Sequence, residues 1–480
     1  MKNSNLLLLA FFALLFSSCS RHGSRADFTR GIGEYPGKVD EYAGPALITD
    51  SGTYRNLAFR RAAYHSSSYD YNLTGHLVTD GIVTDQSPVF LAVSTSDGLV
   101  AKRDRERLFD NNRTSLRVNG GRESFLCVDL RNGSFSSDQV KVTGVLECDL
   151  GEQTGYHWYL DGLPEKGDWV LLGEKQGAGL PGDPTVQASV RAFDYVFQVP
   201  GDLEFTSYRL RMEAGCVKSW EVRELNFLCE GKGHSPLPAR SFRSAWMSGG
   251  AEDEWLYVDL GAESEFDKIV LSWIRKPLSG QIETSSDAVG WKKLADLSLD
   301  ESLEQTVPVN GAGRYVRLSG LKADKSGYIL LSELEVYGKG GVVPVPKPQA
   351  SPVGNRLYLS GGNWRLERVS QVEANGEAIS TPGFPADDWL VATVPGTVAT
   401  SYFNAGAIPD IRYDDDQLQI SESYFYSDFW YRDVFELPSE YEGTALALNF
   451  DGINWKADIY FNGVFAGHID GAFTRARLDV

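Results

Sequence analysis

The sequence of 480 residues has few basic residues and few long apolar stretches, and each shortage excludes a class of protein. Lys and Arg number 46 against 65 Asp and Glu, which gives a net charge of −19. A surface with this excess of negative charge repels a polyphosphate, so no nucleic-acid partner is expected. Beyond its first residues, the sequence contains no apolar run long enough to cross a membrane as a helix.

Cysteine is also scarce, with five residues in the whole chain. Four of them are confined to one segment, and none has the CxxC spacing of a zinc site. An exported protein can oxidise such residues, and four cysteines allow three pairings. Buried free thiols on strands are the alternative. The four residues are Cys127, Cys148, Cys216 and Cys229.

The first residues predict export. Lys2 is followed by an almost wholly apolar run from Leu6 to Phe16, and then by two serines and Cys19. This pattern is typical of a signal peptide, and the run is too short to span a bilayer. A cysteine after small residues resembles the lipobox of bacterial lipoproteins, which implies a signal peptide over 1–18 and lipidation of Cys19. The resemblance places the chain at the bacterial cell envelope, on the outer membrane, facing the periplasm or the surface. An ordinary signal peptide with an incidental cysteine is the alternative.

Short alternating segments are common and long helical periodicities are rare, so the fold class is all-β, with multiple β-sandwiches. Residues 19–53 are polar and Gly-rich, which is typical of a tether. Residues 339–355 contain alternating prolines, which favour an extended, semi-rigid linker. We expect the parts on either side of this linker to fold independently.

Before the linker, four strand-like stretches alternate inward and outward side chains between Gly and Asp turns. Together with Trp246 and the pair Gly290-Trp291, they resemble the discoidin domain, also called the coagulation factor 5/8 type C domain, and its relative, carbohydrate-binding module family 32. On the strand pattern, Trp246 and Trp255 are assigned to the core. The stretches are 254–261 (EWLYVDLG), 266–273 (FDKIVLSW), 314–318 (RYVRL) and 328–337 (YILLSELEVY).

The opening strand and turn of that domain resemble residues 56–69 and 78–81, which lie far upstream of Trp246. The intervening segment repeats the signature in 124–130 (SFLCVDL) and 222–228 (VRELNFL). We therefore predict an outer discoidin-like jelly roll split into 54–86 and 231–338, with a second one, 87–230, nested in it. Two tandem sandwiches are the alternative. Nesting is favoured because the outer domain would otherwise have no first strand and an unpaired edge.

After the linker, residues 356–480 form a third predicted unit. Its matching pieces include 394–397 (VPGT), 429–432 (FWYR) and 446–463 (LALNFDGINWKADIYFNG). They resemble the galactose-binding-like jelly roll that opens family 2 glycoside hydrolases, in the β-mannosidase and exo-β-glucosaminidase branch. In that family a TIM barrel with two catalytic glutamates follows. The resemblance implies a partial, truncated jelly roll without the barrel. We therefore assign no catalytic residue, and interpret Asp414 to Asp416 as a solvated loop.

Sugar binding requires aromatic faces and polar groups that converge on hydroxyls. Discoidin-like modules carry such groups on loops at one end of the sandwich, and family 2 jelly rolls border the active site with a loop. A structural role is the alternative for each candidate. The candidates are Tyr69, Tyr71, His76 and Arg275 in the outer copy, Tyr156, His157 and Trp158 in the nested copy, and Asp410 and Tyr413 in the third unit.

The family 32 resemblance also implies a structural calcium beside the turn, completed by a glutamate of the last strand. Asp80 and Glu333 match these positions in the outer copy, and Asp110 and Glu224 match them in the nested one. Carboxylate and backbone oxygens are the ligands that calcium prefers. A hydrogen-bonded turn without metal is the alternative.

These resemblances predict a non-catalytic, carbohydrate-binding front part of a family 2 glycoside hydrolase. The expected partners are an oligo- or polysaccharide glycan and, through the lipid anchor only, a membrane. The alternative is a stand-alone glycan-binding or adhesion lipoprotein.

Overall fold

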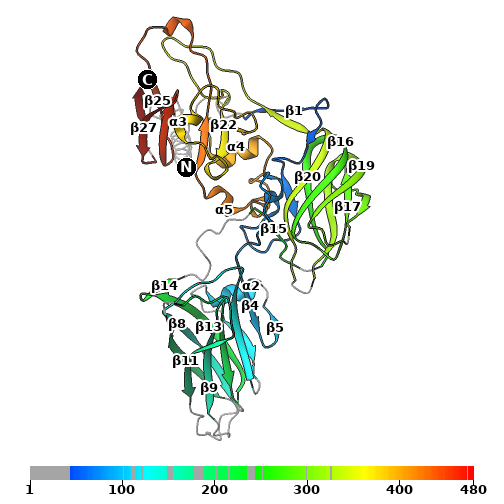
Figure 1. The fold of residues 1–480 in the computed structure, drawn as a ribbon, viewed down its shortest axis with the longest axis vertical. Helices are drawn as coiled ribbons and strands as arrows, with labels where there is room; N and C mark the ends of the chain where they lie inside the picture. Colours follow the sequence, from blue (N-terminus) through cyan, green and yellow to red (C-terminus); the bar gives the residue numbers. More distant parts are fainter. Residues whose placement is uncertain are drawn as a thin grey trace, which may run out of the picture.

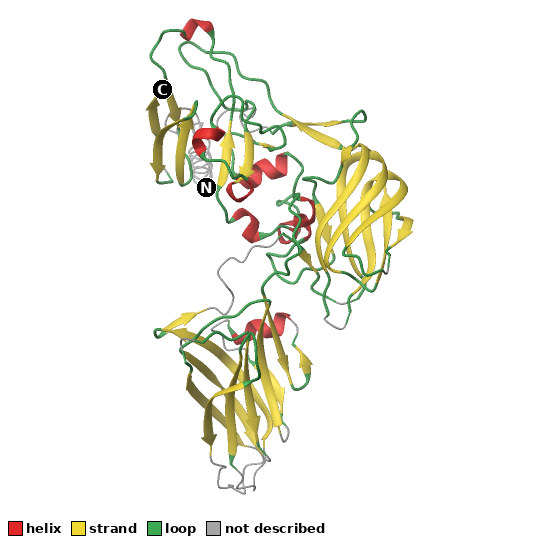
Figure 2. Ribbon diagram, in the orientation of Figure 1, coloured by secondary structure: helices red, strands yellow, loops and turns green. Residues whose placement is uncertain are grey.

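The computed structural model describes most of the chain after residue 43. Figure 1 shows three units, of which the outer sandwich and the third unit lie beside each other, while the nested sandwich projects away from them. Figure 2 shows that strands dominate the first two units and that the short helices gather in the third. Among the described residues, no helix is long and apolar enough to cross a membrane. The described ranges are 44–100, 102–109, 115–120, 123–148, 155–177, 189–200, 203–214, 217–234, 244–250, 252–298, 300–324, 327–472 and 474–480.

The outer sandwich contains strands from both sides of the insert. β2 (Arg55–Asn56) pairs with β20 (Leu330–Gly340), and β3 (Ala63–His65) pairs with β16 (Glu254–Arg275). The segment expected to be one opening strand over 56–69 is therefore two short strands, and the 3-10 helix η2 (Gly75–Thr79) follows them. The sheet has the order β15-β20-β16-β19-β17-β18, with β2 and β3 as additional partners. The remaining strands are β15 (Trp246–Met247), β17 (Ser279–Ser285), β18 (Lys292–Asp296) and β19 (Glu304–Lys322).

The nested sandwich has two facing antiparallel sheets around an aromatic core that includes Trp158, Trp220 and Phe227. Two short helices, α2 (Lys102–Arg105) and η3 (Glu106–Leu108), lie between its strands in the chain. One sheet has the order β10-β9-β12-β7-β4-β5, built from β4 (Phe90–Thr95), β5 (Gly98–Leu99), β7 (Glu123–Arg131), β9 (Tyr156–Leu163), β10 (Val170–Gly177) and β12 (Ser207–Glu213). The other contains β6 (Leu116–Asn119), β8 (Gln139–Cys148), β11 (Ser189–Gln198), β13 (Val217–Cys229) and β14 (Lys232–His234).

Cys127 is buried and Cys229 is exposed, and both are free thiols. The side chain of Cys148 and the whole of Cys216 lie outside the described residues.

The third unit combines three small sheets with short helices. β22 (Arg365–Arg368) lies between β23 (Leu390–Val391) and β24 (Phe429–Arg432). β25 (Ala447–Phe450) pairs with β28 (Ala476–Asp479), and β26 (Lys456–Phe461) pairs with β27 (Val464–Asp470). The helices are η4 (Val369–Gln371), α3 (Gly376–Ile379), α4 (Val398–Asn404), η5 (Asp416–Gln419), α5 (Glu422–Phe425) and η6 (Ser439–Tyr441).

Side-chain caps explain where the three α-helices of this unit begin. Asn375 accepts a hydrogen bond from the Ala378 N–H at the start of α3, and Thr397 and Ser421 cap α4 and α5 in the same way. Each cap satisfies an N–H that has no partner within the helix.

The expected tether and linker are partly strand. β1 (Ala46–Thr49) pairs antiparallel with β21 (Val342–Val345), with Leu47 opposite Pro344. The last residues of the predicted tether 19–53 and the first residues of the predicted linker 339–355 therefore form a two-stranded sheet. A proline is compatible with such a ribbon because both strands are edges.

Candidate functional site

The four candidates in the outer sandwich do not form one cluster. Tyr71 is 53% exposed, and the side chain of Arg275 is 40% exposed and pairs with Asp324 at 3.2 Å. His76 is buried on η2, so its prediction as a sugar-binding residue is wrong. The Tyr69 hydroxyl donates to the carbonyl of Leu91 in the nested sandwich, and the Arg105 guanidinium covers the Tyr69 ring at 4.1 Å. Tyr69 therefore joins the two sandwiches.

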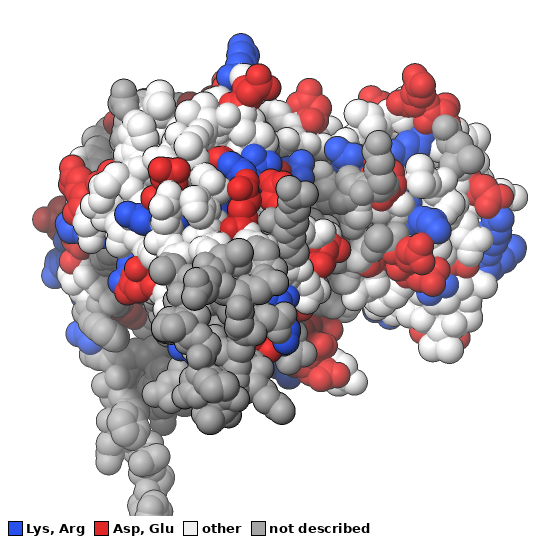
Figure 3. Space-filling view, turned by 90° about the horizontal axis from the view of Figure 1, so that it is seen from below, with Lys and Arg blue, Asp and Glu red and all other residues white. Residues whose placement is uncertain are grey.

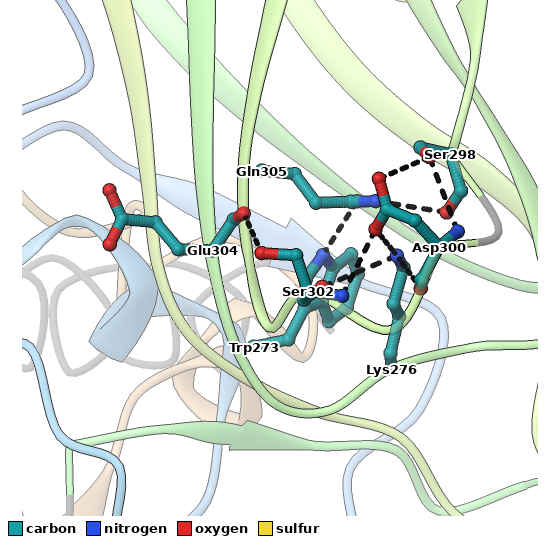
Figure 4. A network of polar contacts seen from close by, with 7 residues as sticks. All are labelled: Trp273, Lys276, Ser298, Asp300, Ser302, Glu304 and Gln305. Carbon is teal, nitrogen blue, oxygen red and sulfur yellow. Dashed lines mark hydrogen bonds and ion pairs between the residues drawn. The ribbon is translucent and has the colours of Figure 1, made fainter.

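A polar network joins the end of β16, beside Arg275, to the loop between β18 and β19. Figure 4 shows Lys276 pointing at Asp300, and the Lys276 ammonium donates to the Asp300 carboxylate at 3.0 Å. The indole N–H of Trp273 donates to Gln305, whose amide in turn donates to the carbonyl of Ser298. The network therefore joins the end of β16, next to Arg275, to the loop between β18 and β19.

In the nested sandwich, the candidates lie on strand β9 and not on a loop. Alternation along the strand directs Tyr156 and Trp158 into the core and His157 outward. Trp158 is completely buried and contacts Trp220 edge-on at 4.9 Å. The predictions of Tyr156 and Trp158 as sugar contacts are therefore wrong. His157 is half-buried beside Tyr159, at 3.3 Å from its hydroxyl.

In the third unit, Asp410 and Tyr413 lie on an exposed acidic loop. Asp410 accepts two hydrogen bonds from the Arg412 guanidinium, at 2.9 and 3.1 Å, and Tyr413 is 70% exposed. The Arg412 hydrogen bonds lower the pKa of the Asp410 carboxyl. On the face drawn in Figure 3, acidic and basic side chains are interspersed over the described residues.

The acidic loop continues into η5, which packs beside β3 of the outer sandwich. There the sheet carries a row of aromatic rings that the sequence assignment missed. Tyr64 stacks on Tyr257 with ring centroids 4.8 Å apart, and Trp255 stacks on Tyr257 at 5.6 Å. Burial and the charge of Asp416 both raise the pKa of Tyr64. The core assignment of Trp255 is wrong, because Leu256 and Val258 take the inward positions of that strand. The alternation of apolar residues along this strand already indicated that Trp255 faces outward.

Asp80 and Glu333 meet beside the turn, as the calcium hypothesis requires. Asp80 accepts hydrogen bonds from the Ile82 N–H at 2.9 Å and from the Ser244 hydroxyl at 2.5 Å. Glu333 accepts one from the Gly81 N–H at 3.2 Å through Oε1, while its buried Oε2 has no hydrogen-bond partner among the described residues.

Burial raises the pKa of Asp80 to about 7. Burial and the neighbouring Asp80 charge raise the pKa of Glu333. Two adjacent buried carboxyls require either a shared proton or a cation. The oxygen without a partner and the hard donor set fit calcium. In the described part of the chain, no group of three or more His, Cys, Asp or Glu side chains is arranged to hold a metal ion, so further ligands would be backbone oxygens or water. In the nested copy, Asp110 lies outside the described residues and Glu224 is half-buried on β13.

Two family models match the chain. Residues 230–334 match the F5/8 type C domain, and residues 364–480 match the galactose-binding domain-like family of glycosyl hydrolase 2. An exo-β-D-glucosaminidase of Streptomyces avermitilis is 30% identical over 159 residues, which cover 32% of this chain and 17% of that protein. A mannosylglycoprotein endo-β-mannosidase of Lilium longiflorum is 30% identical over 135 residues, covering 27% and 14%. The chain thus spans less than a fifth of the length of these curated relatives.

Solved structures similar to this chain include two small modules. A chitosan-binding module of a chitosanase/glucanase from Paenibacillus sp. IK-5 is 25% identical and covers 20% of this chain and 76% of that one, with a TM-score of 0.18. A Clostridium perfringens module in complex with GalNAc-β-1,3-galactose is 18% identical and covers 20% and 75%, with a TM-score of 0.17.

The sheets and the family matches define an assembly of β-sandwich modules of the galactose-binding-like class. Within that class, residues 230–334 are similar to the F5/8 type C domain family, and residues 364–480 are similar to the galactose-binding-like domains of glycosyl hydrolase 2.

Proposed function

We propose that this chain is the non-catalytic, carbohydrate-binding part of a protein related to family 2 glycoside hydrolases. The match of residues 364–480 to the glycosyl hydrolase 2 domain carries this proposal, and the F5/8 type C match supports it. Tyr71 and Arg275 are the proposed sugar contacts, because an exposed ring and a fixed guanidinium suit C–H faces and hydroxyls. The names of the relatives favour glycans of glucosamine or mannose as ligands.

Affinity electrophoresis of the purified chain tests this function. Native gels containing chitosan, mannan or galactan should retard the chain relative to a gel without polysaccharide. An unretarded reference protein of similar charge corrects for sieving. Mobility that is unchanged in every polysaccharide would overturn the proposal.

We propose further that Asp80 and Glu333 hold a structural calcium ion. The ion would neutralise two adjacent carboxylates and fix the turn between η2 and Thr84 against strand β20. Its role is structural, since it would hold loop residues in position. Isothermal titration with Ca²⁺ should show binding to the wild type that Glu333→Gln abolishes, and equal heats for the two proteins would contradict it.

We also propose, on the signal-peptide pattern, that Cys19 is lipidated and anchors the chain at the bacterial envelope. Mass spectrometry of the chain purified from membranes should find diacylglycerol on Cys19. Recovery of the wild type in the soluble fraction, equal to that of Cys19→Ser, would refute the anchor.

A further inference from the structure

The segment between Arg60 and Thr79 of the outer sandwich contacts the third unit at several points along its length. Leu77, on η2, is completely buried and belongs to the same apolar cluster as Leu366, Leu390 and Tyr402 of the third unit. One side chain of the outer sandwich is therefore part of the core of the unit that follows the linker. On the same element, the ring of His76 lies edge-on to that of Tyr424 on α5, with ring centroids 5.2 Å apart.

Two arginines of this segment pack against the third unit, Arg61 buried and Arg60 with a side chain that is 12% exposed. The Arg60 guanidinium pairs with the Glu367 carboxylate on β22 and donates to the carbonyl of Asp388 at 2.9 Å. The Arg61 guanidinium donates to the carbonyl of Ala405 at 2.8 Å, and burial lowers its pKa to about 10. A buried charge that loses its partner is strongly destabilising, so these contacts specify how the two units fit.

Hydrogen bonds to the backbone complete the contact. The Ala62 N–H donates to the carbonyl of Gly406 at 3.1 Å, and the His65 N–H donates to the Gln419 side chain at 2.9 Å. From the other side, the N–H groups of Ser421 and Glu422 donate to His76 Nδ1 and to the carbonyl of Tyr71, at 3.0 and 2.9 Å. Backbone groups paired in this way would be left unsatisfied if the two units separated.

We call the contact of residues 60–79 with the third unit the junction. We infer that the outer sandwich and the third unit form one cooperatively folding body, joined by this junction rather than by the Pro-rich segment. This inference replaces the expectation that the parts before and after the linker fold independently. Because the Tyr71 carbonyl accepts the Glu422 N–H, the junction also fixes the position of Tyr71 relative to the acidic loop that carries Asp410 and Tyr413. The inference holds whatever ligand the chain binds.

A specific protease site inserted after Ser351 tests the inference in the full chain, because that stretch is exposed and irregular. After complete cleavage, the two pieces should elute together in size-exclusion chromatography at the volume of the uncut protein. Separate elution of the two pieces at micromolar concentration would overturn the inference.

Two variants of the cleavable protein identify the junction as the cause. Leu77→Ala removes an apolar side chain at the junction and should weaken the association of the pieces at least ~10-fold, as large-to-small core changes do. Leu271→Ala makes a similar cavity within the outer core alone and should change the association less than ~3-fold. If Leu77→Ala does not fold, Arg60→Met serves in its place. Equal effects of the junction variant and Leu271→Ala would contradict the inference.

Discussion

Asp161 and Arg209 stand directly opposite each other on strands β9 and β12, and the buried Asp161 carboxylate accepts a hydrogen bond from Arg209 at 3.1 Å. The Arg209 guanidinium also covers the Trp169 ring at 4.2 Å. The outer sandwich repeats this arrangement. Glu283 is the cross-strand partner of Arg317, which covers the Trp291 ring at 4.0 Å. In both copies the tryptophan follows the acidic residue by eight positions.

Because the two arrangements match, both tryptophans should stabilise their sandwiches. Trp291→Ala and Trp169→Ala should each lower the free energy of unfolding by about 1 to 3 kcal/mol, through loss of the cation–π contact and of buried area. Urea unfolding, followed by circular dichroism, measures this change. Trp455→Ala, at an exposed position, is the control and should cost less than about 0.5 kcal/mol. Equal losses for all three variants would contradict the account.

The carboxyl pair predicts stability that decreases as pH rises. Burial raises the pKa of Asp80 to about 7 in the folded chain and also raises that of Glu333, so both favour the protonated form. Their contribution is complete below the ordinary carboxyl range and is lost as pH rises toward about 7. In a chelator, the melting temperature of the wild type relative to that of Glu333→Gln should therefore fall between about pH 4 and pH 7.

Calcium should reverse this loss, since it replaces the proton between the two carboxylates. Glu333→Gln should flatten the pH dependence and abolish the calcium response, while Glu304→Gln, on the surface, should preserve both. A wild-type melting temperature at neutral pH that does not respond to calcium would count against the metal site.

His76 predicts the opposite pH dependence. Burial, helped by the charges of His65 and Arg368, lowers the pKa of His76 to about 3, and its Nδ1 must stay unprotonated to accept the Ser421 N–H. Folding therefore loses stability as pH falls below about 6.5, by up to ~1.4 kcal/mol per pH unit. His76→Asn keeps an acceptor and should reduce this acid slope, which urea titrations at several pH values measure. His157→Asn is the control, and an identical slope in the wild type and His76→Asn would refute the prediction.

Sugar binding at the outer sandwich should depend on exposed groups. Tyr71→Ala and Arg275→Ala should each weaken binding of the retarding glycan about 10-fold or more, since each removes a stacking face or a hydroxyl partner. Tyr358→Ala, at another exposed tyrosine, is the matched control. Unchanged affinity in both site variants, measured by affinity electrophoresis, would move the sugar site elsewhere.

The all-β class followed from local patterns, because strand alternation such as that of Leu256 and Val258 depends only on neighbouring residues. The same alternation puts Trp255 and Tyr257 on one face of the strand, and the structure directs both outward, although Trp255 was assigned to the core. The junction could not be predicted in this way. Arg60 and Glu367 are far apart in the sequence, and nothing local to either residue indicates its partner.

The outcome for each candidate site residue also depended on whether a local pattern or a distant contact determines its position. The pairing of Asp80 with Glu333 depends on a turn and a strand that the family resemblance identifies, and the structure brings them together. Tyr156 and Trp158 were assigned to a loop although they alternate with outward residues on β9. His76 has a polar side chain in a polar segment, and its burial results from the third unit packing over it.

One measurement tests the central claim most directly. The purified chain is incubated with the glycan that retards it, and the bound fraction and the released sugars are determined on the same sample by ultrafiltration and chromatography. The account predicts saturable binding with the glycan recovered at its original length. Absence of saturable binding, or steady release of sugar that persists through further purification, would contradict it.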